Sequence, residues 1–252
     1  MEILADLLDE IVPLNSPHED EQSIFVSFRD SLQGFLYHNL YCPEKEIRQP
    51  AVNIGPVYFD YGYALFENGQ YDEAEQALAE ARSWCPMDSD YSFEYIEVFK
   101  ARGNFEQFRE LTLAEMKKAY SARILARGYR NLGYYYIEKE DYPTAVMLYQ
   151  MSMLFDDQSE AVERELRYIS QITGREIKFY SSDDVHSTFL KKGIPLGADP
   201  QILELIASFA KWCLEQKYVS AAKSCLQIFY ELTDDEEVKK IIDSLPDDTE
   251  EK

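Results

Sequence analysis

The sequence predicts an all-α protein built from consecutive antiparallel helix pairs. Apolar residues recur every three or four positions along most of the chain, which is the spacing of one helix face. The 10 glycines and 10 prolines cluster between these segments rather than inside them, as expected for helices joined by short connections. In addition, two stretches that begin at Gly55 and Ala126 carry similar residue types at the same spacings, which indicates an internal repeat.

The first 54 residues predict two helices that pack on the repeats that follow. An apolar stripe covers residues 3–12, and Pro13 marks the end of that helix. A second helix is expected to begin at the capping box Ser16-Pro17-His18-Glu19 and to stop before Pro43. Its inner face would hold Ile24, Phe25, Phe28, Leu32, Phe35 and Leu36. Residues 42–55 then form a connection.

Positions in the repeat are numbered from the first residue of each stretch, so Gly55 and Ala126 are both position 1. Large side chains stand at positions 4, 7, 11, 17 and 24, where they would fill the space between neighbouring helices, and small ones at positions 8 and 20 would let two helices approach closely. The first stretch supplies Tyr58, Tyr61, Gly62, Leu65, Gly69, Tyr71, Ala74, Leu78, Ala81 and Pro86. The second supplies Tyr129, Leu132, Gly133, Tyr136, Glu140, Tyr142, Ala145, Tyr149, Ser152 and Asp157. Glu140 and Asp157 depart from the pattern, because they stand where the first stretch has glycine and proline.

Weaker helical segments complete the chain. A degenerate unit is expected over about 90–125, with its turn at Gly103-Asn104, and a further helix from about Ala161 is expected to end at Gly174. A loop containing Tyr180 to Asp184 follows. The cap and proline of Asp199-Pro200 predict another helical hairpin, which turns near residues 216–218. A short final helix around residues 238–245 then acts as a cap, and residues 246–252 form a frayed tail.

These residues resemble the tetratricopeptide-repeat family, with the repeats over 55–175 and a repeat-like hairpin and cap over 176–245. The likeness is specific over about 55–157, and the whole chain is also similar to uncharacterised repeat proteins of Firmicutes. The resemblance implies a right-handed superhelix of antiparallel helix pairs, an α-solenoid. It further implies that the first helix of each pair lines a concave groove that binds an extended or helical peptide, and it implies no catalysis.

Composition narrows the class of function. The chain has 252 residues, of which 46% are hydrophobic, so it can bury a core. Its 47 acidic and 25 basic residues give a net charge of -22, which disfavours nucleic acid and anionic membranes as partners. The opening residues have no basic segment before the apolar ones, and no stretch approaches the length of a membrane span. We therefore expect a soluble cytoplasmic protein.

The sequence gives little indication of catalytic or metal-binding residues. The three histidines, His18, His38 and His186, stand outside any nucleophile motif, and the acidic clusters lack the spacing of a calcium loop. The four cysteines include no C-x-x-C pair, and we expect them to be buried, reduced thiols. Cys213 and Cys225 could nevertheless meet across a helical hairpin. We expect no enzyme activity, no cofactor and no metal.

The groove implied by the resemblance gives the candidate site. In this family positions 2, 5, 9 and 12 of the first helix face the groove. In the first unit they hold Pro56, Phe59, Tyr63 and Phe66, and in the third Arg127, Arg130, Tyr134 and Ile137. Aromatic bodies beside two guanidinium groups suit a peptide with apolar side chains and a carboxylate. Two alternatives stay open: Arg127 and Arg130 could pair internally with Glu94 and Glu97, or the N-terminal helix could fill the groove.

The partner is a protein or peptide whose identity the sequence does not give. The lysine and asparagine clamp by which some family members grip acidic chaperone tails is absent, because Phe59 and Tyr63 stand in its place. A scaffold or adaptor is the leading interpretation. The alternatives are a peptide-sensing regulator, although residues 1–54 lack a basic recognition helix, and a self-assembling protein whose aromatic groove forms a homo-oligomer.

Overall fold

The computed structural model describes residues 2–14 and 18–246. The expected capping residues Ser16 and Pro17 and the expected tail from 247 onward lie outside this range. Within it the chain is all-α apart from two short strands, and it divides into two compact units, Met1–Asn104 and Phe105–Lys252. The boundaries expected from the sequence at 54, 175 and 245 remain a proposal.

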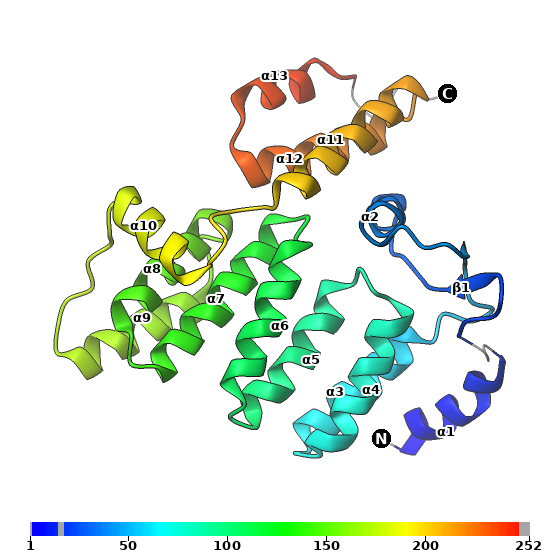
Figure 1. The fold of residues 1–252 in the computed structure, drawn as a ribbon, viewed down its shortest axis with the longest axis horizontal. Helices are drawn as coiled ribbons and strands as arrows, with labels where there is room; N and C mark the ends of the chain where they lie inside the picture. Colours follow the sequence, from blue (N-terminus) through cyan, green and yellow to red (C-terminus); the bar gives the residue numbers. More distant parts are fainter. Residues whose placement is uncertain (1, 15–17, 247–252) are drawn as a thin grey trace. The chain divides into compact units, whose positions relative to one another are not determined.

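The first unit contains the N-terminal segment and the first helical hairpin (Figure 1). Its elements are α1 (Glu2–Ile11), the 3-10 helix Val12–Leu14, β1 (Ser23–Phe25), α2 (Ser31–Tyr41), β2 (Glu46–Arg48), α3 (Gly55–Glu67), α4 (Tyr71–Trp84) and α5 (Ser89–Ala101). The second unit consists of α6 (Phe105–Lys117), α7 (Ala122–Glu138), α8 (Tyr142–Phe155), α9 (Glu160–Thr173), α10 (Ser182–Lys192), α11 (Pro200–Glu215), α12 (Val219–Thr233) and α13 (Glu236–Ser244).

The prediction of a helix from about residue 16 to Pro43 is wrong over its first half. Ser23–Phe25 is a strand, paired in parallel with Glu46–Arg48, and the helix begins only at Ser31. Two aspartates explain the change. Asp20 accepts hydrogen bonds from the backbone N–H groups of Gln22 and Ser23 and so forms a turn, and Asp30 caps α2 by accepting from the N–H of Gln33.

The turn between paired helices has the same geometry wherever the first helix of a pair ends. The residues that complete the turns after α3, α5, α7 and α11 all have positive φ: Gly69 (75°), Gly103 (71°), Glu140 (57°) and Lys217 (65°). In each case the next residue donates its N–H to a carbonyl five residues earlier, as from Gln70 to Leu65 and from Asp141 to Tyr136. This is the Schellman ending of a helix. The same ending also follows α10, where Gly193 has φ 64° and the N–H of Ile194 donates to the carbonyl of Phe189, so the turn is common to these helices but does not by itself define the repeat.

Close helix approach at the predicted small position is also repeated. A Cβ atom built on Gly62 would lie 2.7 Å from Cγ of Leu78, and one built on Gly133 would lie 2.7 Å from Cζ of Tyr149. In both hairpins a glycine at position 8 therefore faces the side chain at position 24, as the repeat register requires. The fold is all-α and tetratricopeptide-repeat-like, and Figure 1 shows the hairpins α3/α4, α7/α8 and α11/α12.

In the first unit the N-terminal segment packs on the first hairpin. Ile54, Trp84 and Tyr91 belong to a buried cluster, and Ile11 and Phe25 of the N-terminal segment pack against it. The N–H of Ser27 also donates to the carbonyl of Trp84 at 2.8 Å. These contacts place Ile11, Phe25 and Ser27 beside the end of α4.

In the second unit the C-terminal half differs from the sequence prediction at one element. Of the expected loop over residues 180–184, Tyr180 and Ser181 are not helical, but Ser182 begins helix α10, which Ser181 caps and Gly193 ends. Phe189 of this helix is fully buried beside Tyr129 of α7. The helix ending at Gly174 and the helix beginning after Asp199 are confirmed.

Candidate functional site

The predicted groove residues of the first unit lie on α3. Phe59 stacks on Tyr91 of α5, with ring centroids 4.5 Å apart, and its other neighbour along the helix is Tyr63 at 6.4 Å. Tyr63 is 45% exposed, whereas Phe59 is half-buried against the core. We call the surface formed by Phe59, Tyr63 and Tyr91 the α3 aromatic face. Phe66, also on α3, is half-buried against Tyr71, with ring centroids 5.5 Å apart.

The predicted groove residues of the third repeat lie on α7, in the second compact unit. One of them, Arg130, has a partner within the chain. Its guanidinium forms an ion pair with Asp156 at 2.8 Å and donates to Oγ of Ser152 at 3.3 Å. Only 20% of the Arg130 side chain is exposed. Burial lowers the pKa of Arg130, and the charge of Asp156 partly offsets that effect. Arg130 therefore joins α7 to the end of α8.

The other candidate residues of α7 are also partly or wholly packed. Tyr134 lies between Phe105 and Phe108 of α6, with centroid distances of 6.1 and 6.2 Å. Arg127 is half-buried, and Ile137 is buried. Among the candidates, Tyr63 is thus the large side chain most open to a partner.

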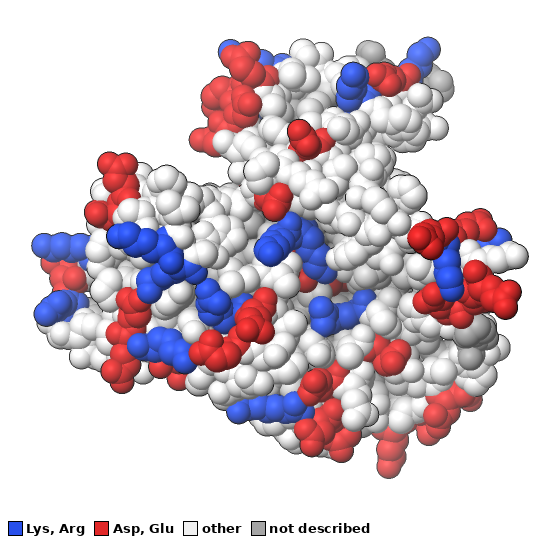
Figure 2. All heavy atoms as spheres, in the orientation of Figure 1, with Lys and Arg blue, Asp and Glu red and all other residues white. Residues whose placement is uncertain are grey.

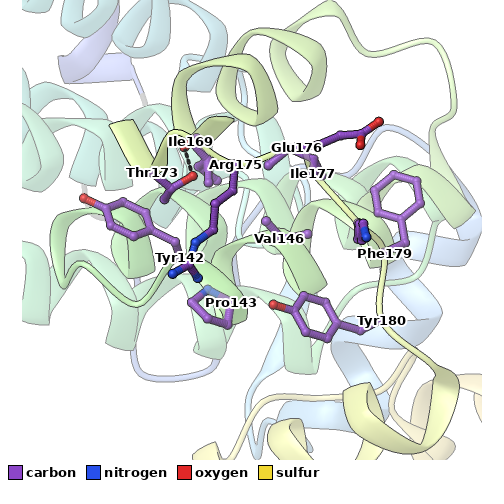
Figure 3. Close-up of a pocket in the computed structure, with 11 residues that line it drawn as sticks. Tyr142, Pro143, Val146, Ile169, Thr173, Arg175, Glu176, Ile177, Phe179 and Tyr180 are labelled. Carbon is purple, nitrogen blue, oxygen red and sulfur yellow. Dashed lines mark hydrogen bonds between the residues drawn. The ribbon is translucent and has the colours of Figure 1, made fainter. Parts of the chain in front are cut away.

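A hollow that the sequence did not predict lies at the end of the repeat helices in the second unit. It has a volume of about 270 Å³ and is formed by α8, the end of α9 and the segment that leads to α10. Its lining residues are Tyr142, Pro143, Val146, Ile169, Thr173, Arg175, Glu176, Ile177, Lys178, Phe179 and Tyr180. In Figure 3, Arg175 reaches across the hollow toward Tyr142 and Pro143, while Glu176 points away from it.

Two signals in the sequence could have indicated this hollow. Gly174 ends α9, so the polar and aromatic residues 175–180 that follow it are not helical but remain close to the end of α9. Phe179 is a large apolar side chain in a stretch with few others, and it is 55% exposed. In Figure 2, Lys and Arg side chains lie interspersed with Asp and Glu side chains over the region of α7 to α10, although the chain as a whole is strongly acidic.

Groups that could perform chemistry are dispersed in the described part of the chain. No cluster of three or more His, Cys, Asp or Glu side chains that could hold a metal occurs among residues 2–14 and 18–246. His18 packs on Trp84, with ring centroids 4.1 Å apart, and His38 lies in the last turn of α2. Burial raises the pKa of the Cys85 thiol to about 12, which opposes a nucleophilic thiolate at neutral pH. None of the described helices combines the length and apolar character needed to cross a membrane.

Comparison with known proteins gives structural likenesses. No protein-family model matches the sequence, and no curated protein matches it. Similar solved structures include the first tetratricopeptide repeat domain of Spaghetti (RPAP3) bound to the HSP90 peptide SRMEEVD, at 17% identity and a TM-score of 0.39, covering 48% of this chain and 94% of that one. Another is a thermophilic tetratricopeptide-repeat protein from Thermus thermophilus, at 14% identity and a TM-score of 0.38, covering 75% and 97%. The helix pairs, their common endings and the close approach at Gly62 and Gly133 define the fold of this chain.

Proposed function

We propose that this chain is a non-enzymatic interaction module, a scaffold or adaptor, which binds a protein or peptide partner. The observation that carries the proposal is the α3 aromatic face. Tyr63 presents an amphipathic ring to solvent, and the stacked pair of Phe59 and Tyr91 fixes the helix beneath it. A rigid aromatic side chain loses little conformational freedom on binding, which makes tyrosine common at the energetic centre of interfaces.

The chemistry of the chain fits this proposal better than catalysis. Among the described residues no His, Cys, Asp and Glu side chains gather into a metal-binding cluster. The hydroxyls that donate to carboxylates at Ser181–Asp184 and Thr144–Asp141 belong to helix caps, which is a structural role. The cysteines, Cys42, Cys85, Cys213 and Cys225, are free thiols, as expected in the reducing cytoplasm where we place the protein. The candidate groove residues remain part of the proposal, with Phe59, Tyr63 and Phe66 in the first compact unit and Arg127, Arg130 and Tyr134 in the second. Among them, Tyr63 is the contact most accessible to the partner.

The proposal is tested by affinity capture with a matched pair of variants. Wild-type chain, Tyr63→Ser and Tyr168→Ser would be used to capture proteins from a lysate of the native host, followed by mass spectrometry. Tyr168 lies on α9 and is 46% exposed, so its replacement removes the same chemical group at nearly the same exposure as Tyr63. We expect a partner that Tyr63→Ser loses and Tyr168→Ser keeps. A partner held equally by both variants would remove the α3 aromatic face from the site.

Self-association is a second candidate, favoured by the C-terminal hairpin. Trp212 of α11 is 47% exposed and stacks on Phe209, and Tyr218 beside it is 57% exposed. A surface with an exposed tryptophan and tyrosine together is typical of protein contacts. A monomeric mass in solution at high protein concentration would exclude this candidate.

A further inference from the structure

We propose that the hollow beside Arg175 is a second peptide site, which takes an extended segment carrying a carboxylate next to an apolar side chain. The site is separate from the α3 aromatic face, and it uses a different kind of recognition. Three features of the second unit lead to it: a cation without a partner, a run of backbone groups without hydrogen bonds, and an apolar floor.

The cation is Arg175. Its guanidinium makes no ion pair and no hydrogen bond to a side chain or carbonyl within residues 18–246, whereas its own carbonyl accepts a hydrogen bond from Oγ of Ser170 at 2.7 Å. The side chain extends over Tyr142 and Pro143 in Figure 3. Arg175 is exposed, and its guanidinium can present two parallel donors, which match the two oxygens of a carboxylate.

The backbone run consists of residues 176–179. It is fixed at both ends, because Gln150 donates its side-chain amide to the carbonyl of Tyr180 at 3.0 Å and accepts from the N–H of Tyr180 at 2.9 Å. Between Arg175 and Tyr180 the four residues have no secondary structure, and their N–H and C=O groups make no hydrogen bond to any described residue. A peptide laid along this segment can pair with these groups, as in strand addition.

The floor is apolar and lies directly beside this segment. Val146 and Ile169 are buried at its base, and the ring of Tyr180 turns back toward them in Figure 3. Phe179 stands at the rim, more than half exposed. An apolar side chain of the peptide would fill the hollow and cover Phe179, while the neighbouring carboxylate meets Arg175. Lys178, also at the hollow, favours the same negative charge.

The first step of the test is selection of peptides by the full chain from a displayed library of short random sequences with free C-termini. We expect the selected sequences to share an apolar residue next to a carboxylate. Each is then synthesised with a free and with an amidated C-terminus, and its binding is measured by fluorescence anisotropy. Loss of binding on amidation would identify a terminal carboxylate, and retention would identify an Asp or Glu side chain, and both agree with the proposal.

The second step compares charge-reversal variants. Arg175→Glu should weaken binding by about tenfold or more, since it replaces a charge-assisted pair by repulsion. Arg164→Glu, an exposed arginine of α9 outside the hollow, makes the same change of charge and should leave affinity within about twofold. Circular dichroism of each variant checks that the helices are intact. Amide exchange at residues 176–179 should slow when the peptide is bound to the wild-type chain.

Several results would overturn the inference. These are a library that yields no enriched sequence, peptides that bind Arg175→Glu as well as wild type, and amides 176–179 that exchange equally fast with and without peptide. Dimerisation that Arg175→Glu abolishes would assign the hollow to a second copy of the chain instead. Because Tyr63→Ser should not affect the selected peptides, failure here is distinguishable from failure of the α3 aromatic face.

Discussion

Glu140 occupies a backbone conformation that favours glycine. Its φ of 57° matches the 75° of Gly69 and the 71° of Gly103 at the same point of the turn. A residue with a Cβ in this left-handed region costs roughly 1–2 kcal/mol relative to its preferred conformations. The departure from the repeat pattern at Glu140 therefore changes the energy of the turn but leaves its geometry intact.

We predict that Glu140→Gly stabilises the chain. The gain should be about 0.5–1 kcal/mol, since relief of the left-handed strain exceeds the greater entropy that glycine has in the unfolded chain. Chemical denaturation at neutral pH measures it. Glu138→Gly serves as the control: Glu138 is the last residue of α7, where glycine should be neutral or destabilising. Equal destabilisation by both changes would contradict the strain argument.

The ion pair of Arg130 tests whether this α7 residue stabilises the fold or is available to a binding partner. In its pair with Asp156 the side chain of Arg130 is 20% exposed and that of Asp156 35%, so replacing Arg130 by glutamate would place two carboxylates side by side in a partly buried position. We predict that Arg130→Glu lowers the melting temperature, and that the double variant Arg130→Glu with Asp156→Arg recovers part of the loss. The measurement is a double-mutant cycle followed by thermal unfolding. If Arg130→Glu left the melting temperature unchanged, the pair would contribute nothing to stability and Arg130 would be available for a partner.

Sequence alone placed Arg130 correctly on the first helix of its pair but could not supply its partner. The register fixes which face of α7 a side chain occupies, because the helical period is local. Asp156 lies at the far end of the next helix, and the reach of an arginine side chain across the hairpin depends on the packing between α7 and α8. For the same reason the stacking of Phe59 on Tyr91 is set by tertiary packing and not by spacing in the sequence.

At the scale of a helix pair, the glycine at position 8 sets how closely the two helices approach. A Cβ on Gly133 would lie 2.7 Å from the Tyr149 ring, and this ring is buried, so it has no free space into which to move. The same contact occurs between Gly62 and Leu78 in the first hairpin, so the close approach of the two helices recurs from one repeat to another.

We predict that Gly133→Leu loosens or unfolds the α7/α8 hairpin. The overpacking should cost about 1–3 kcal/mol or more, because α7 and α8 must separate to admit the side chain. Gly197→Leu is the matched control, since a Cβ there meets no atom within 4 Å and its φ is not positive. Thermal unfolding by circular dichroism compares the two. A melting temperature for Gly133→Leu equal to that of the control would contradict the repeat register.

The sequence prediction missed helix α10 and the strands β1 and β2, for different reasons. For α10 the signals were present: Ser181 caps the helix, the basic pair Lys191 and Lys192 lies in its last turn, and Gly193 follows with φ 64°. The helix is short and buries few apolar residues, so the periodicity was weak. For β1 the local spacing of apolar residues did resemble a helix, and the pairing with β2, whose residues lie 23 positions further along the chain, prevailed over it.

At the scale of the whole chain, negative charge opposes the compact state. The net charge is -22, so even if every lysine and arginine paired with a carboxylate, a large excess of carboxylates would remain. In the ion pair of Lys139 with Glu106 the two side chains are 44% and 65% exposed, and in that of Lys240 with Glu237 they are 68% and 78% exposed. Each exposed pair contributes about 0–1 kcal/mol. Repulsion among the unpaired carboxylates acts over the whole surface and should exceed the attraction of these pairs.

We therefore predict that sodium chloride raises the melting temperature at neutral pH. At about 0.01 M salt the screening length is roughly 30 Å, comparable to a small domain, whereas near 0.15 M it is about 8 Å, so repulsion between distant carboxylates largely disappears. Each kcal/mol of repulsion removed should raise the melting temperature by roughly 2–4 °C. Near the sequence pI of about 4.5 the net charge vanishes, and the effect of salt should vanish with it. A melting temperature that falls with added salt at neutral pH would mean that attraction within the ion pairs outweighs the repulsion of the excess carboxylates.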